Sequence, residues 1–172
     1  MIVGDTNEFS KWLASDGMSW VPRKITTPYK TRQLSIRLPD TYLRMIALID
    51  IVFQPFAGEQ FKGAAIYVAE FDTGGEIASK MLFDGIRSLV SGREVDLAIN
   101  DFTQFSATEY DDLYGLFLFA ALGSWDAWLV ARDCREVIRI HSAGFLEVDA
   151  ENIAILDVLR ERCKERSIVV RN

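Results

Sequence analysis

The chain contains a single histidine, His141, and its surroundings decide whether it can do chemistry. The segment from 124 to 149, SWDAWLVARDCREVIRIHSAGFLEVD, also holds two of the four tryptophans and one of the two cysteines. Imidazole changes charge most readily near neutral pH, so it is the first candidate for acid–base work. Val137, Arg139 and His141 alternate with isoleucines, the period of a strand that buries one face. We expect His141 on the outward face.

Carboxylates on the next expected strand offer His141 a structural role. Glu147 and Asp149 share a face there, so Arg139 and His141 are expected to lie opposite carboxylates as ordinary cross-strand pairs. A catalytic histidine needs a nucleophile and an orienting group within hydrogen-bond reach. Ser142 is adjacent in sequence, but neighbours along a strand point to opposite faces. A local catalytic triad is therefore not predicted.

The triplet Asp72-Thr73-Gly74 follows an apolar strand and looks like the active-site turn of aspartic proteases. That chemistry needs two carboxylates that share one proton, and the sequence has no second copy of the triplet. Thr73 and Glu76 have the spacing of a capping box, which explains the turn as the start of a helix. We prefer this structural interpretation.

The remaining reactive groups also have structural explanations. Asp111 and Asp112, with Glu109, lie at an expected helix start, where carboxylates complement the helix dipole. They lack the loop spacing of a cation site. Cys134 and Cys163 belong to no CxxC motif and are expected to be reduced thiols, Cys134 in a hairpin turn. We predict no metal and no cofactor.

Trp125 and Trp128 are three residues apart in an expected strand, so they point to opposite faces. One of them must therefore point away from the side that buries the other. We expect that Trp128 lies either under another element or on the surface, as an anchor of the kind that dominates protein interfaces.

The elements that position these residues follow from hydrophobic period and from capping and turn residues. The segment from 40 to 53 is nearly all apolar, and we prefer a buried helix there because Pro39 precedes it and Pro55 follows it. Ser142-Ala143-Gly144 is predicted to turn a hairpin. Helices are expected near 5–13, 40–53, 77–89, 107–122 and 152–163, and strands near 34–38, 64–71, 95–99, 125–131, 136–141, 145–149 and 168–170.

This order of elements predicts the α+β class. We expect one domain over residues 1–172, with a mainly antiparallel sheet that includes a C-terminal three-stranded meander and is packed by about five helices. No regular alternation of strand and helix supports a parallel sheet.

Charge narrows the possible partners. The net charge of -6 argues against nucleic acid, whose binding needs clustered Lys and Arg. Apolar runs are too short to cross a bilayer, and the first residues lack the pattern of an export signal, so we expect a cytoplasmic protein without membrane association. No Lys or Arg occurs between Arg93 and Arg132, where acidic residues concentrate. Such a segment could steer a basic partner.

We therefore expect a noncatalytic protein-binding module that uses an acidic surface to bind a protein partner, with a basic protein as the first candidate. Its general character is that of small acidic α+β domains that neutralise bacterial toxins, an immunity-like class, although no motif is specific to them. The alternative is an enzyme or small-molecule-binding protein whose pocket assembles from separated residues such as His141, Asp72 and Cys134. The predicted partner-binding residues are Asp96, Asp101, Asp111, Asp112, Trp128, Arg139, His141 and Glu147.

Overall fold

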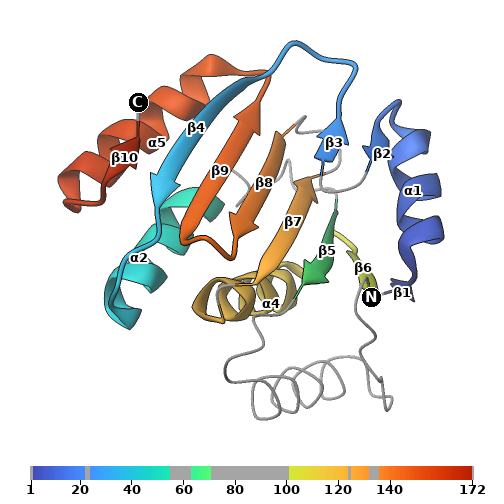
Figure 1. Cartoon of the computed structure of the whole chain (residues 1–172), viewed down its shortest axis with the longest axis horizontal. Helices are drawn as coiled ribbons and strands as arrows, with labels where there is room; N and C mark the ends of the chain where they lie inside the picture. Colours follow the sequence, from blue (N-terminus) through green and yellow to red (C-terminus); the bar gives the residue numbers. More distant parts are fainter. Residues whose placement is uncertain are drawn as a thin grey trace.

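The computed structural model describes residues 2–21, 24–54, 63–70, 101–123, 125–131 and 136–171, and these form an α+β fold (Figure 1). Its described helices are α1 (Thr6–Ser15), α2 (Tyr42–Phe53), α4 (Tyr110–Leu122) and α5 (Ile153–Glu165). Its described strands are β1 (Ile2–Gly4), β2 (Ser19–Val21), β3 (Lys24–Thr26), β4 (Arg32–Arg37), β5 (Ala64–Glu70), β6 (Asp101–Phe105), β7 (Asp126–Ala131), β8 (Glu136–His141), β9 (Phe145–Ala150) and β10 (Val170–Arg171).

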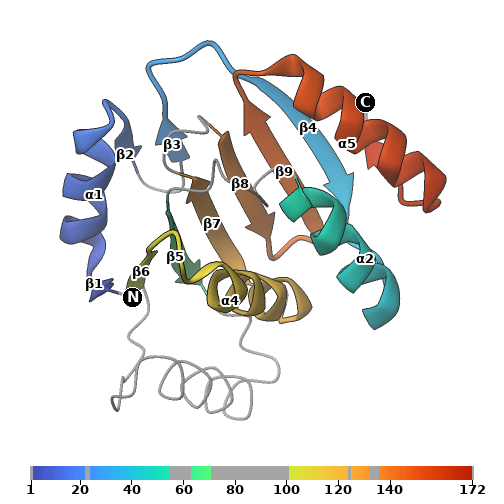
Figure 2. The same ribbon diagram turned by 180° about the vertical axis from the view of Figure 1, so that it is seen from behind.

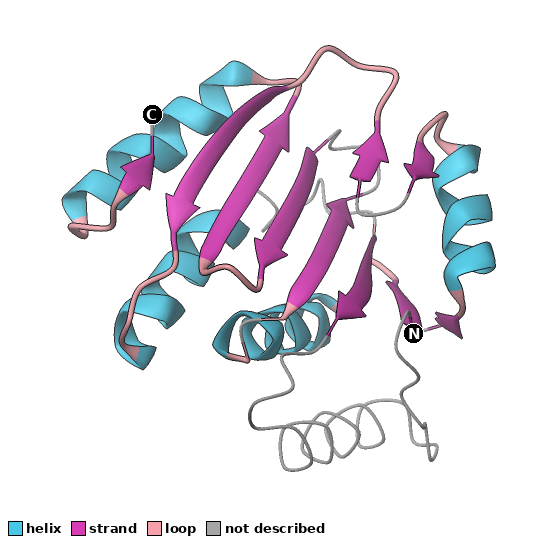
Figure 3. Cartoon of the chain, in the orientation of Figure 1, coloured by secondary structure: helices cyan, strands magenta, loops and turns pink. Residues whose placement is uncertain are grey.

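Eight of these strands form one sheet in the order β1-β6-β5-β7-β8-β9-β4-β10, and every described pair in it is antiparallel (Figure 3). Strands β7, β8 and β9 are consecutive in both the chain and the sheet, which is the predicted meander. The turn between β8 and β9 places Gly144 at φ 85°, a left-handed conformation that glycine adopts without steric cost. Strands β2 and β3 form a separate two-stranded hairpin.

The two faces of the sheet are covered differently. Helices α2, α4 and α5 lie on one face (Figure 2) and enclose the larger apolar core, which includes Ile36, Ile138, Ile140 and Leu146. Helix α1 and the β2–β3 hairpin lie on the other face, toward β5, β6 and β7 (Figure 1). The strand β7 is buried along its whole length because both of its faces are covered.

Local signals placed several elements correctly. Asp5 and Glu8 form the predicted capping box at α1. The apolar segment from 40 to 53 is helical, with α2 beginning at Tyr42. Asn152 caps α5 by accepting a hydrogen bond from the backbone N–H of Ala154.

Other expectations need correction. Four helices lie in the described residues, fewer than the five expected; the helix near 77–89 and the strand near 95–99 fall outside those residues. Helix α4 begins at Tyr110 instead of directly after Ser106. Glu109 does accept a hydrogen bond from the backbone N–H of Ser106, at 2.7 Å, but Ser106 does not cap the helix. Strands β1, β2, β3 and β6 were not predicted.

Among the described residues, no helix combines the length and the apolar character that a membrane crossing requires.

Candidate functional site

The outward sides of β4, of β9 and of the second half of β8 are not covered by α1 or by the hairpin, and we call this surface the open face (Figure 1). Along these strands, inward residues such as Ile138 and Val148 are buried, whereas the residues between them are mostly polar. Register aligns these polar side chains across the three strands, because Gln33 pairs with Asp149 and Ser35 with Glu147. The outward residues of the open face are Gln33, Ser35, Arg37, Arg139, His141, Phe145, Glu147 and Asp149, whereas Val137, on the same side of β8, is buried in the core beneath α1 and the hairpin.

A pocket of about 370 Å³ lies where the open face meets the β2–β3 hairpin, and we call it the hairpin pocket. The strands supply its floor, and the hairpin with the following loop supplies its wall. It is lined by Lys24, Ile25, Thr27, Thr31, Gln33, Trp128, Val137, Arg139, Glu147 and Asp149. Three of the predicted partner-binding residues therefore meet in one place: Trp128, Arg139 and Glu147.

Arg139 is held between an aromatic ring and a carboxylate. Its guanidinium carbon lies 4.4 Å from the centre of the Trp128 ring, in a cation–π contact, and its Nη2 lies 3.6 Å from Oδ2 of Asp126. Its Nε is buried and has no hydrogen-bond partner among the described residues. Glu147 is directly opposite Arg139 in the register, but no ion pair joins the two in the described part of the chain.

Glu147 bonds instead to His141. The His141 Nε2 and Glu147 Oε2 atoms are 2.7 Å apart, and the imidazole stacks on Phe145 with ring centres 4.0 Å apart. The expected cross-strand pairing therefore holds for His141, but with a diagonal partner, because Phe145 occupies the directly opposite position. His141 lies on the outward face as predicted, half-buried, and it does not line the hairpin pocket.

Asp149 is a carboxylate of the pocket that sequence analysis considered only as a strand neighbour. Its burial, and next the charge of Glu147, raise its pKa above the ordinary value, while a hydrogen bond from Gln33 and the charge of Lys24 act in the opposite direction. Asp149 follows Glu147 by two residues on β9 and therefore shares its face, which was the signal that could have placed it in the site.

Trp128 is 1% exposed, so of the two predicted possibilities it takes the first and lies under another element. The ring of Trp20, on β2, meets it edge to face with centres 5.1 Å apart, and Tyr67 packs beside it. Trp125 is also buried, on the opposite face with the larger core. Trp128 therefore supports the floor of the pocket and is not an exposed anchor.

The predicted acidic residues do not join the open face. Asp111 and Asp112 lie in the first turn of α4, on the helix-covered side of the sheet (Figure 2). Asp50 of α2 accepts a short hydrogen bond from the hydroxyl of Tyr114, on the same helix as these two residues. Helix α4 and the side chain of Arg139 lie on opposite faces of the sheet, so Asp111 and Asp112 are not part of the open face. Asp101 begins β6, and Asp72, Asp96 and Cys134 lie outside the described residues.

Sequence analysis also missed Glu136. This side chain points to the helix-covered face at the start of β8 and is 3% exposed. Its burial raises its pKa to about 7. The alternation of β8 places it with Ile138 and Ile140, which was the available signal.

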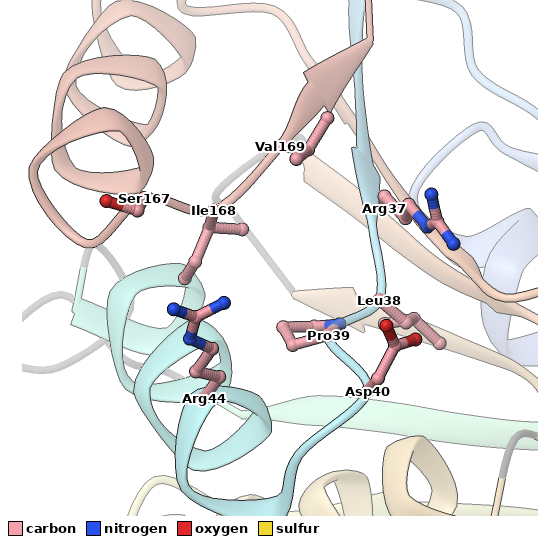
Figure 4. Close-up of a pocket in the computed structure, with 8 residues that line it drawn as sticks. All are labelled: Arg37, Leu38, Pro39, Asp40, Arg44, Ser167, Ile168 and Val169. Atoms are coloured by element: carbon pink, nitrogen blue, oxygen red, sulfur yellow. The ribbon is translucent and has the colours of Figure 1, made fainter.

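A second pocket, of about 130 Å³, lies between β4, the start of α2 and the segment after α5 (Figure 4). It contains two arginines, Arg37 and Arg44, and could therefore suggest an anion site. In Figure 4 the guanidinium of Arg37 points away from that of Arg44, so the two do not converge on one ligand position. We assign no site there.

The described residues of the open face include few of the groups that catalysis would use. A histidine that is hydrogen-bonded to a carboxylate can act as a general base if it also contacts a nucleophile. No hydrogen bond among the described residues joins His141 to a serine, threonine or cysteine. Within the same residues, no three side chains of the metal-binding types gather at one point. Burial raises the pKa of the Cys163 thiol to about 11, which keeps it from forming a nucleophilic thiolate at neutral pH.

A comparison of the chain with protein-family models, curated proteins and solved structures gives no match. The residues and geometry of the open face are therefore the basis on which a function can be assigned.

Proposed function

We propose that the chain is a cytoplasmic, noncatalytic protein-binding module that binds its partner on the open face. The observation that carries this proposal is the uneven cover of the sheet: one face is closed by three helices, whereas the open face presents ordered polar side chains on rigid strands. Side chains held on strands need little further ordering on binding, which favours affinity.

The interactions on this face favour binding over catalysis. His141, Arg139 and Asp126 hold one another or their neighbours in place through ion pairs and ring contacts. Such a network fixes the position of charges that a partner can match. Complementary charges contribute specificity and fast association more than raw affinity.

A basic protein remains the partner that we propose, in keeping with the toxin-neutralising class. The net charge of -6 attracts such a protein over a distance, whichever face it finally contacts. The local charges of the open face are mixed, with Arg37 and Arg139 beside Glu147 and Asp149. We therefore expect a basic partner that also presents acidic groups at the interface.

The test is a comparison of partner capture between matched variants. Arg37→Glu and Ser35→Arg change the open face at an exposed and a half-buried strand position, and Arg160→Glu is the control on the exposed side of α5. We expect a stoichiometric partner that the wild type and the control retain and that both open-face variants lose. Added salt should weaken its capture, because exposed charges are screened.

A fourth variant separates the open face from the acidic end of α4. The double substitution Asp111→Asn with Asp112→Asn removes charge there and leaves β4, β8 and β9 unchanged. If this variant loses the partner while Arg37→Glu and Ser35→Arg keep it, the binding surface is the acidic one and the open face is the wrong assignment.

A further inference from the structure

The hairpin pocket has the size of a small-molecule site. Its volume of about 370 Å³ lies at the lower end of the range typical of ligand pockets, roughly 300–1,000 Å³. Pockets of this kind combine apolar walls with a few polar groups that orient the ligand. Here Ile25 of the wall and Val137 and Trp128 of the floor form the apolar lining, and charged side chains of both signs stand around it.

Arg139 has hydrogen-bonding capacity left for a ligand. A guanidinium has five N–H donors, and that of Arg139 has one ion pair, from Nη2 at 3.6 Å to Asp126, and no hydrogen bond among the described residues. Because its Nε is buried, the donors left for a ligand are those on the Nη atoms. Its contact with Trp128 fixes the plane of the group. A planar fork with free donors is suited to a carboxylate. Lys24 lines the same pocket from the hairpin and adds a second positive charge.

Glu147 and Asp149 place negative charge beside these cations. They lie two residues apart on the same side of β9, so both carboxylates face the pocket. Asp149 pairs with Val137 in the register and is therefore the diagonal neighbour of Arg139, about 7–8 Å away at the level of the strands. Glu147 lies directly opposite Arg139 in the register, and the charge of Lys24 acts on Asp149, so positive and negative groups stand side by side in one small pocket.

This arrangement selects among ligand classes. A phosphate would meet two carboxylates, and a simple amine would meet Arg139 and Lys24, so like charges oppose both ligands. A neutral ligand would leave the free donors of Arg139 unsatisfied. A molecule with a carboxylate and an ammonium group close together matches the adjacent positive and negative groups, and an apolar side chain on it would lie against Ile25 and Val137.

We propose that the hairpin pocket binds an α-amino acid with an apolar side chain. Arg139, assisted by Lys24, binds the carboxylate of this ligand. Glu147 and Asp149 accept hydrogen bonds from its ammonium group. The site shares Arg139, Glu147 and Asp149 with the open face, but binding of the amino acid requires no partner protein.

The test is a titration of the purified full chain, labelled with nitrogen-15, with three compounds. L-Leucine carries both charges, L-leucinamide lacks the carboxylate, and N-acetyl-L-leucine lacks the ammonium group. We expect leucine to shift the amide signals of residues 137–139 and 147–149 until they saturate. Each blocked compound should bind at least about tenfold more weakly, because it loses one set of charge-assisted hydrogen bonds.

Variants then test the positive and the negative groups of the pocket separately. Asp149→Asn and Lys24→Gln should each weaken leucine binding, while Asp157→Asn, an exposed position on α5, should leave it unchanged. Arg139 is not substituted, because its packing on Trp128 couples it to the fold. Equal shifts with all three compounds, or no saturable shift with any, would overturn the proposal. The titration contains no partner, so its failure is distinguishable from a failure of the docking proposal.

Discussion

Two carboxylates of the sheet, Glu136 and Asp149, show how strand alternation sets the properties of single residues. Both have a raised pKa, and burial is the largest cause in each case. Asp149 faces the hairpin pocket, where Gln33 and Lys24 oppose the shift. Glu136 faces the helix-covered side, where burial alone determines the shift. A carboxylate is thus available to a ligand on one face of the sheet, whereas on the other face its ionisation lowers the stability of the fold.

Glu136 gives a prediction about stability and pH. Its folded pKa of about 7 lies above the ordinary value of 4.5, so between these values the folded state holds a proton that the unfolded state has released. Its contribution to stability is therefore fully present below pH 4.5 and is lost as pH rises toward 7. Glu136→Gln should match the wild type near pH 4.5 and exceed its free energy of unfolding by about 1–3 kcal/mol at pH 8.

Urea unfolding at pH 4.5, 6 and 8 measures this difference, and Glu161→Gln, an exposed position on α5, is the control. A difference that stays constant with pH would mean that Glu136 is ionised in the folded protein.

At the scale of elements, the sequence predicted those whose signals are local. Helix α1 has a capping box, α5 has an asparagine cap, and β4, β8 and β9 alternate between apolar and polar residues. The elements that were missed are short and depend on distant partners. Strands β2 and β3 have three residues each and are held on the sheet by packing that no local pattern encodes. The hairpin pocket could not be predicted, because that hairpin forms its wall.

Gly115 and Gly144 allow the effect of backbone conformation on stability to be tested apart from the effect of packing. A methyl group added at Gly115, in α4, or at Gly144, in the β8–β9 turn, meets no atom within 4 Å. Gly144 has φ 85°, whereas Gly115 is helical. Gly144→Ala should therefore lower the free energy of unfolding by about 1–2 kcal/mol, and Gly115→Ala should raise it by about 0.5–1 kcal/mol. Thermal and urea unfolding check both signs, and a loss of stability in both variants would mean that contacts decide the outcome.

At the scale of the whole molecule, one sheet separates two environments that the sequence could not distinguish. The predicted site residues Arg139, His141 and Glu147 share the open face because β8 and β9 are neighbours in register. The predicted residues Asp111 and Asp112 lie on the other side, because their helix packs there. Sequence alternation predicted which residues share a strand face. It could not predict which face of the sheet α1, α4 and the hairpin cover, because that depends on the assembled sheet.

Trp128 is the residue at which these layers meet, and its role provides the last prediction. It lies between the sheet and the hairpin, in contact with Trp20 and Tyr67, and Arg139 rests on its ring. An exposed anchor could be removed without harm to the fold, whereas a buried tryptophan leaves a cavity. We expect Trp128→Ala to lower the free energy of unfolding by about 3–5 kcal/mol, and Arg37→Ala, at an exposed position of the open face, to change it by less than about 0.5 kcal/mol.

Urea unfolding of both variants is the measurement, with the far-ultraviolet circular dichroism of each at zero urea as a check that it folds. The comparison matters because Trp128 forms part of the pocket floor. If Trp128→Ala unfolds at the same urea concentration as the wild type, the hairpin is not held by this contact, and the pocket that it encloses would not be a fixed site. A large loss of stability in Trp128→Ala, with Arg37→Ala unaffected, would show that Trp128 belongs to the framework that positions Arg139. It would also show that exposed polar residues of the open face can be substituted in binding experiments without loss of the fold.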